Sequence, residues 1–198
     1  MAAKSSATQA ATKAAVGPRI RVRTSRVHGK GVFAARPIAK GERIIEYTGE
    51  IITWKEAQRR HPHDPAQPNH TFYFHIDDQY VIDALYGGNS SRWINHSCDP
   101  NCEADEEDGR IFITALRDIA PGEELNYDYG LVIDAPLTPE LKAEYPCWCG
   151  SANCRGTLLS PADGDKPGKG GKKKGGKKKK KKNKKDKKDK KEKKSRKD

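Results

Sequence analysis

The stretch RWINHSCDPNC, residues 92–102, gathers an Arg, a Trp, two Asn, a His, an Asp, a Pro and two Cys in eleven positions. It is too polar for a core strand and too rich in reactive side chains for an ordinary loop. Three interpretations are open at this point: a cysteine nucleophile with its histidine, a metal site, or a binding site for a small molecule.

Three further cysteines, Cys147, Cys149 and Cys154, follow in the spacing C-x-C-x4-C. The Gly and small polar residues between them let three thiolates converge on one side of a tetrahedral zinc ion. A fourth ligand has to come from elsewhere, and Cys98 and Cys102 are the candidates. Five cysteines, an odd number clustered late in a chain without a secretory signal, favour a metal over disulfides, with free surface thiols as the alternative. Four thiolates leave no position for water, so the predicted zinc is structural.

The nucleophile interpretation requires His96 to activate Cys98, two residues along the chain. Catalytic Cys–His pairs usually meet from distant parts of a sequence, so this spacing is a weak signal. The interpretation also fails if Cys98 is a metal ligand.

The charge of the chain is divided unevenly. Residues 166–198 hold 21 Lys or Arg and 4 Asp or Glu, whereas residues 1–165 hold 18 basic and 23 acidic residues. The mildly acidic body suits a cationic substrate, and the tail suits nonspecific contact with nucleic acid through residues 166–198. We expect residues 1–18 and 161–198 to be disordered, with an organelle transit peptide as the alternative for the first segment. For the C-terminal tail, the alternative to nucleic-acid contact is a solubilising appendage. No apolar run approaches the ~18 residues of a membrane span, so no membrane partner is expected.

The body reads as short β-branched or aromatic segments separated by Gly, Asp and Pro, which predicts a mostly β domain of small sheets. The predicted strands lie within residues 20–34, 42–52, 72–77, 80–84, 110–119 and 124–130. Residues 54–60 and 138–145 are the predicted helices, the second with Thr138 as its N-cap and Pro139 at its first position. The acidic run Glu103–Asp108 is either a solvated loop or an aid to collecting a basic substrate.

Two other segments are ambiguous when taken alone. HGKGVF, residues 28–33, has the Gly-x-Gly of a tight hairpin turn or of a close backbone approach to a ligand. Tyr127 and Tyr129 alternate along a predicted strand and share a face, where they either pack or line a pocket.

Taken in order, these segments resemble the SET-domain protein lysine methyltransferases. The resemblance is carried by HGKGVFA (28–34), ERIIEYTGEII (42–52), GNSSRWINHSCDPNCE (88–103), PGEELNYDYG (121–130) and CWCGSANCRGTL (147–158). It covers roughly residues 19–159. It implies a SET domain at 19–131, followed by a connecting helix and a post-SET zinc module at 132–160. Within the SET domain, the signature segment (residues 88–103) and the strand after it would cross as a pseudoknot.

The resemblance also implies the activity, an S-adenosylmethionine-dependent protein-lysine N-methyltransferase. Its substrates would be basic proteins, whether histone-like, DNA-associated or ribosomal, and the lysine-rich tail itself is open to self-methylation. The cofactor site would comprise His28, Lys30, Gly31, Phe72, Arg92, Trp93, Asn95 and His96. The substrate channel would comprise Phe72, Tyr73, Tyr127 and Tyr129. The zinc ligands would be Cys98, Cys147, Cys149 and Cys154, with Cys102 left as a buried thiol.

Tyr129 corresponds to the family's catalytic tyrosine. Tyr127 occupies a position that is Phe or Tyr in the family, and Tyr there favours mono- or dimethylation. One motif departs from the pattern, because the family's Y-x-F reads Phe72-Tyr73-Phe74 here, and Phe72 cannot donate a hydrogen bond.

An amine must be neutral to attack, and for a free lysine of pKa ~10.4 neutrality at pH 7 costs roughly 4.6 kcal/mol. A narrow aromatic channel beside a sulfonium lowers this cost by desolvation and by repulsion between like charges, so no strong base is needed.

The rival class is a non-catalytic chromatin or nucleoid protein that holds DNA through its tail. We expect an intracellular location, in the nucleus of a eukaryote or the cytoplasm and nucleoid of a bacterium. Short length and the absence of accessory domains favour the bacterium.

Overall fold

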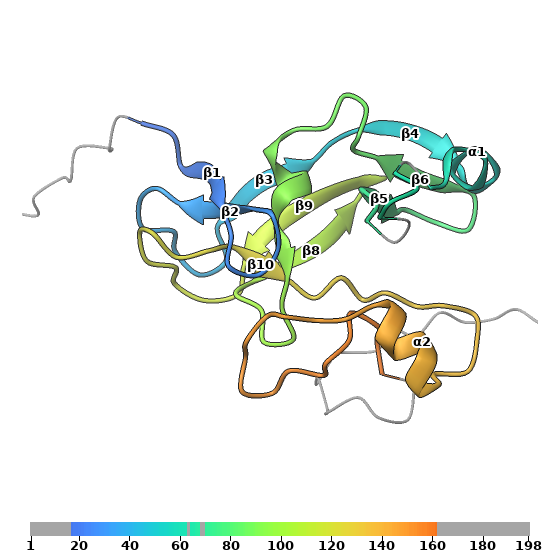
Figure 1. The fold of residues 1–198 in the computed structure, drawn as a ribbon. Helices are drawn as coiled ribbons and strands as arrows, with labels where there is room; N and C mark the ends of the chain where they lie inside the picture. Colours follow the sequence, from blue (N-terminus) through green and yellow to red (C-terminus); the bar gives the residue numbers. More distant parts are fainter. Residues whose placement is uncertain (1–16, 63, 68–69, 162–198) are drawn as a thin grey trace, which may run out of the picture. The chain divides into compact units, whose positions relative to one another are not determined.

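The computed structural model describes residues 17–62, 64–67 and 70–161 (Figure 1). The predicted tails lie outside the described residues, apart from Gly17, Pro18 and Pro161. Within the described ranges, no helix has the length and apolar character needed to cross a membrane.

Short strands dominate the described residues, as predicted. In chain order the elements are β1 (Ile20–Thr24), β2 (Lys30–Ala34), β3 (Arg43–Tyr47), β4 (Glu50–Thr53), α1 (Trp54–Arg60), β5 (Tyr73–His75), β6 (Tyr80–Asp83), the 3-10 helix η1 (Ser90–Trp93), β7 (Asn95–His96), β8 (Cys102–Glu107), β9 (Arg110–Ala115), β10 (Asn126–Tyr127) and α2 (Pro139–Glu144). They form four small sheets, ordered β1-β2, β3-β9-β8, β4-β6-β5 and β10-β7. Figure 1 shows β3, β9 and β8 side by side.

Both predicted helices are present, and their caps explain where they begin. The hydroxyl of Thr53 accepts the backbone N–H of Glu56 at 3.2 Å, and the hydroxyl of Thr138 accepts that of Leu141 at 3.2 Å. Pro139 occupies the first turn of α2, where its missing N–H costs nothing.

The predicted strand 42–52 is two strands that belong to different sheets. The chain breaks at Gly49, where an added Cβ would lie 2.7 Å from the Cα of Ala84 and 2.7 Å from the carbonyl oxygen of Asp83. Only glycine fits so close a backbone approach. The prediction of a single strand was therefore wrong at this point.

The acidic run Glu103–Asp108 lies mostly in a strand, so the loop predicted there was also wrong. Asp108 and Gly109 both have positive φ, 52° and 75°, the conformation of a tight hairpin turn between β8 and β9. Cys102 is buried, and alternation leaves Glu103 and Asp105 exposed; Glu106 and Glu107, next to the turn, are exposed as well.

One buried cluster packs the signature segment against the β10 segment, which carries Tyr127. Its members are Val32, Ala34, Ile38, Ile94, Cys102, Ile113, Ala115, Ile119, Leu125 and Tyr127. Strand β7 pairs in parallel with β10, Asn95 opposite Asn126 and His96 opposite Tyr127. Asn101 and Asn126 exchange two bonds, each side-chain oxygen accepting the other's backbone N–H at 3.0 and 2.9 Å. The pairing places the two segments of the predicted pseudoknot side by side, and the threading itself stays a prediction.

Candidate active site

Two tyrosines of the β10 segment lie beside the signature. Tyr127 is buried, and its ring centroid is 5.0 Å from that of Tyr129. The ring of Tyr129 is 40% exposed, but its hydroxyl points inward and donates to the carbonyl of Ile94 at 2.9 Å. Desolvation raises the pKa of both phenols well above the usual value of 10. Both therefore keep their protons at neutral pH and are available as hydrogen-bond donors.

His96 connects Tyr129 to the cysteines. Its Nδ1 accepts the backbone N–H of Tyr129 at 3.1 Å, and its Nε2 lies 3.4 Å from Sγ of Cys98. Burial lowers the pKa of His96 to about 4, so the ring is neutral at pH 7. Because Nδ1 accepts a bond, Nε2 carries the proton and donates it to the sulfur. A histidine in this tautomer has no free lone pair with which to deprotonate Cys98, which argues against the nucleophile interpretation.

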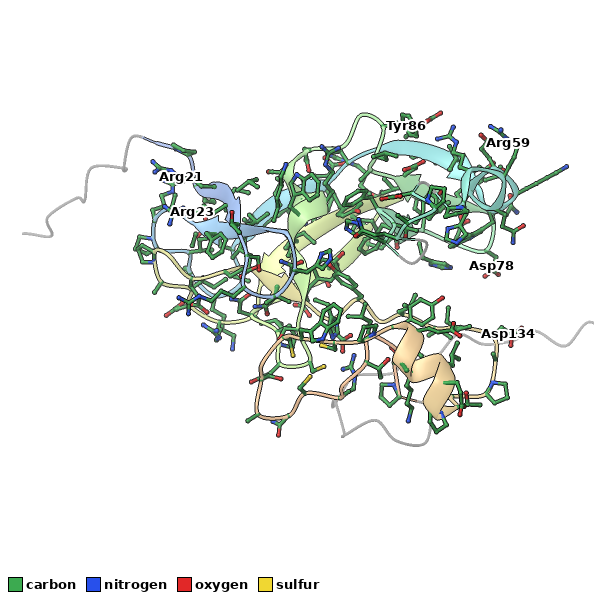
Figure 2. All side chains as sticks on the ribbon, in the orientation of Figure 1. Arg21, Arg23, Arg59, Asp78, Tyr86 and Asp134 are labelled. Carbon is green, nitrogen blue, oxygen red and sulfur yellow. The ribbon has the colours of Figure 1, made fainter. Side chains whose placement is uncertain are left out.

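Four sulfur atoms, those of Cys98, Cys147, Cys149 and Cys154, lie within 4.8 Å of one another, and Cys98 and Cys147 are 3.7 Å apart. Zn–S bonds of about 2.3 Å in a tetrahedron require sulfur separations of about 3.8 Å, so the group is compatible with a structural zinc. Figure 2 shows the yellow sulfur atoms beside the C-terminal loop.

Cys98 rather than Cys102 joins this group. Cys102 is fully buried in the core, where desolvation raises the pKa of its thiol to about 12. Backbone N–H groups of Arg155 and Gly156 donate to the sulfurs of Cys98 and Cys154 at 3.3 and 3.4 Å, as they do to thiolate ligands.

The C-terminal segment is also held by an ion pair and a short bridge. Arg155 donates two bonds to Asp128, at 2.7 and 3.0 Å, and this pair keeps the pKa of Asp128 below its usual value although desolvation opposes it. Leu131 pairs in parallel with Leu159. The cysteine cluster therefore lies on a segment that is bonded to the residues flanking Tyr129.

The side chain of Asn95 holds the glycine turn. Its Nδ2 lies 3.0 Å from the carbonyl of Lys30, 3.4 Å from that of His28 and 2.8 Å from Oε1 of Glu124. Three predicted cofactor residues, Asn95, His28 and Lys30, are thus brought together.

Cations flank the ring of Trp93. The Nζ of Lys30 is 4.6 Å and the Cζ of Arg92 is 4.8 Å from its centroid, and Phe72 meets the ring edge-on at 5.1 Å. The Nε of Arg92 is buried and has no hydrogen-bond partner among the described residues. An unsatisfied guanidinium donor and a second cation over the same ring suit a carboxylate.

Trp148, between Cys147 and Cys149, was not predicted as a site residue. Its ring is 61% exposed and lies nearly parallel to His28, at 12° and 6.4 Å between centroids. An exposed aromatic face can stack on a flat heterocycle. The sequence feature that could have indicated Trp148 is its position inside the C-x-C motif, next to two predicted metal ligands.

Within the altered Y-x-F motif, Phe72 and Phe74 pack against one buried cluster and Tyr73 against another. Phe74 lies 6.1 Å from Tyr127, whereas the hydroxyl of Tyr73 donates to the carbonyl of Ala57 in α1 at 3.2 Å. Neighbouring residues of a strand face opposite sides, so the structure does not bring Tyr73 to the tyrosine pair. Tyr47, which was not predicted, donates its hydroxyl to the carbonyl of Phe72 at 3.0 Å and packs 5.0 Å from Phe74.

Comparison with known families and sequences gives a consistent result. Residues 29–130 match the family model described as the SET domain. The chain is 41% identical over 135 residues to the histone-lysine N-methyltransferase trithorax of Drosophila virilis, covering 66% of this chain and 3% of that protein. It is 42% identical over 139 residues to the H3 lysine-4 specific histone-lysine N-methyltransferase of Schizosaccharomyces pombe, covering 68% of this chain and 14% of that one.

A solved structure gives the same picture. The chain resembles ctPRC2 in an autoinhibited conformation bound to S-adenosylmethionine, with a TM-score of 0.52 and 35% identity over 58% of this chain and 15% of the other. This chain thus spans only a small part of the relatives named here. The two curated relatives come from eukaryotes, and neither supports the bacterial origin that the short length favoured.

Proposed function

The chain belongs to the SET-domain family, and we propose that it is a protein-lysine N-methyltransferase that uses S-adenosylmethionine as methyl donor. The observation that carries this proposal is the Tyr127–Tyr129 pair packed against Asn95 and His96, with the Tyr129 hydroxyl held at the carbonyl of Ile94.

The residues around Trp93 fit such a cofactor. S-adenosylmethionine would supply a methyl group on a positive sulfonium, together with an adenine, a ribose and a carboxylate. Lys30 and the unsatisfied Nε of Arg92 are suited to the carboxylate, and the exposed ring of Trp148 is suited to the adenine.

The tyrosines orient the attacking amine. With their pKa values raised, Tyr127 and Tyr129 stay protonated and neither acts as a base. They would position the neutral amine of the lysine, which gives up its proton to water beforehand, in line with the methyl group that the cofactor would supply. Positioning of this kind accounts for a large share of catalysis in such transfers. Tyr127 limits the space beside the amine, which favours one or two methyl groups.

The proposed substrates are lysine-rich proteins that are histone-like, DNA-associated or ribosomal, and the proposed compartment is the nucleus. The 21 basic residues of 166–198 support nonspecific contact with nucleic acid, with affinity that falls steeply as salt rises.

Self-methylation of lysines in 166–198 is part of the proposal. The N–H of Ser160 donates to the carbonyl of Leu131 at 2.8 Å, two residues beyond Tyr129. Lys166 follows Ser160 by six residues, a length of at most about 20 Å when extended. That length supports transfer within one chain.

The test is transfer from labelled S-adenosylmethionine by the full chain to histone peptides, to a lysine-rich linker-histone-type protein and to its own tail, read by mass spectrometry. We expect methylated lysine with wild type and a loss of about 10²-fold in kcat with Tyr129→Phe. Tyr80→Phe, a matched change of an exposed tyrosine outside the site, should transfer normally. Absence of both transfer and cofactor binding in calorimetry would favour the non-catalytic nucleic-acid binder instead.

A further inference from the structure

The carboxylate of Glu124 joins two parts of the cofactor region that are far apart in the sequence. Its Oε2 accepts the hydroxyl of Ser25 at 3.0 Å, and its Oε1 accepts Nδ2 of Asn95 at 2.8 Å. The backbone around it runs beside β2, where Phe33 bridges to Glu124 and the N–H of Leu125 donates to Val32 at 2.8 Å. Both carboxylate oxygens therefore have defined partners.

Ser25 begins the turn that carries His28 and Lys30. Its N–H donates to the carbonyl of Gly29 at 2.9 Å, and its hydroxyl oxygen accepts the N–H of Val27 at 2.9 Å. The other end of the turn is held by Asn95, which donates to the carbonyl of Lys30 at 3.0 Å. Glu124 contacts both of these anchors, so one side chain fixes the turn at its two ends.

Gly31 shows how close the carboxylate approaches. A Cβ at this position would lie 2.2 Å from Oε1 of Glu124, 2.8 Å from its Cδ and 3.0 Å from Cβ of Ser25. No special backbone conformation requires glycine here; the space is filled by the Glu124 carboxylate. The second glycine of the turn is thus explained by a residue 93 positions later in the chain.

The turn is the loop of the β1–β2 hairpin, closed by the pairing of Thr24 with Lys30, and it has few contacts with the buried core. Arg26, His28, Gly29 and Lys30 are exposed, and none of the turn residues 25–29 belongs to a buried cluster of the described core. The two bonds that Glu124 accepts, from Ser25 and from Asn95, therefore add to the hairpin pairing in positioning the turn. The turn's His28 and Lys30 face Trp148 and Trp93 respectively, so its position sets the geometry of the proposed cofactor site.

We propose that Glu124 is a positioning residue for cofactor binding: it holds the turn 25–31 against Asn95, and its carboxylate occupies the space that a side chain at position 31 would need. This inference rests on the proposed function, because the ligand is S-adenosylmethionine. Glu124 touches neither the amine nor the transferred methyl group in this role. Its loss should weaken cofactor binding and leave the degree of methylation unchanged.

The experiment uses the full chain and measures two quantities: the Kd of S-adenosylmethionine by calorimetry, and amide hydrogen exchange of residues 25–31. Glu124→Ala and Gly31→Ala should each raise Kd about tenfold or more, and Ser25→Ala, which removes one bond, about threefold. Exchange in the turn should become faster in all three. Glu107→Gln, an exposed glutamate paired with Arg43, is the matched control and should change neither quantity.

The double variant Gly31→Ala with Glu124→Ala gives the sharpest result. Removing the carboxylate removes the clash with the new Cβ, so Kd should stay within about threefold of Glu124→Ala alone rather than multiply. Multiplied effects would overturn the proposal, as would Ser25→Ala and Glu124→Ala proteins whose turn exchanges at the wild-type rate or whose Kd is unchanged. If the wild type binds no cofactor, it is the proposed function that fails, which is a distinct result.

Discussion

The Nδ1 atom of His96 accepts the backbone N–H of Tyr129 at 3.1 Å, while the other nitrogen of the same ring donates to Cys98. One imidazole therefore connects the proposed catalytic tyrosine to a sulfur of the cysteine cluster. The cysteine cluster can therefore influence the position of Tyr129 through His96, although a four-thiolate zinc site would have no open position for a substrate.

Replacing His96 by alanine should lower kcat by about 10²-fold, because Tyr129 loses the bond that fixes its backbone and misplacement by about 1 Å can cost that much. All four cysteines remain, so zinc content should stay near one ion per chain. Steady-state kinetics and metal analysis of the same preparation check this. His75→Ala, an exposed histidine, is the control; a His96→Ala enzyme with wild-type kcat would contradict the coupling.

The sequence predicted the elements that local chemistry decides. Both helices begin where a threonine can cap them, at Thr53 and Thr138, and the cysteine spacing was sufficient to predict a metal cluster. Cys98 was chosen as fourth ligand through the family resemblance, and the sulfur positions agree with that choice.

The predictions that failed depended on contacts between distant segments. Nothing near Gly49 in the sequence reveals that the backbone of Ala84 will press against it and divide a strand. The contact of Tyr73 with α1 likewise depended on which face of β5 meets that helix, which a single strand does not reveal; its channel role stays a prediction. Glu124 was missed as a site residue because its partners, Ser25 and Asn95, lie 99 and 29 residues away.

Removing one cysteine of the cluster should release the C-terminal segment. Cys154→Ser should lower bound zinc well below one ion per chain and make residues 145–160 sensitive to limited proteolysis, because a three-thiolate site holds the metal less tightly. Cys102→Ala is the matched control and should keep its zinc, since Cys102 lies outside the cluster. Equal zinc content in both variants would show that the cluster does not bind the metal as described.

The buried thiol of Cys102 gives a pH prediction. Desolvation raises its pKa to about 12, above the unfolded value, so it favours the neutral form in the folded state. Its contribution to stability is fully present below about pH 8.5, the ordinary thiol pKa, and is lost as pH rises toward 12.

Denaturant unfolding of wild type and Cys102→Ala at pH 7, 9 and 10 measures this contribution. The difference in free energy of unfolding between the two proteins should shrink as pH rises above 9, by up to about 1.4 kcal/mol per pH unit. A difference that stays constant from pH 7 to 10 would mean that the thiol ionises as freely in the folded protein as in the unfolded chain.

Tyr127→Phe should raise the number of methyl groups added to each lysine. Tyr127 is buried, with its ring 5.0 Å from Tyr129 and 6.1 Å from Phe74, so its hydroxyl occupies space inside the aromatic group. Removing one oxygen frees room for a methylated amine to rotate, while the rings on either side still exclude bulk water. Mass spectrometry of a lysine-rich substrate after long incubation should show mono- and dimethyl-lysine with wild type and a shift to trimethyl-lysine with the variant.

Tyr47→Phe is the control for loss of a buried hydroxyl as such. It removes a hydroxyl bonded to the Phe72 carbonyl, and it should leave the distribution of methylated products unchanged. An identical distribution for Tyr127→Phe and wild type would exclude Tyr127 as the residue that limits methylation.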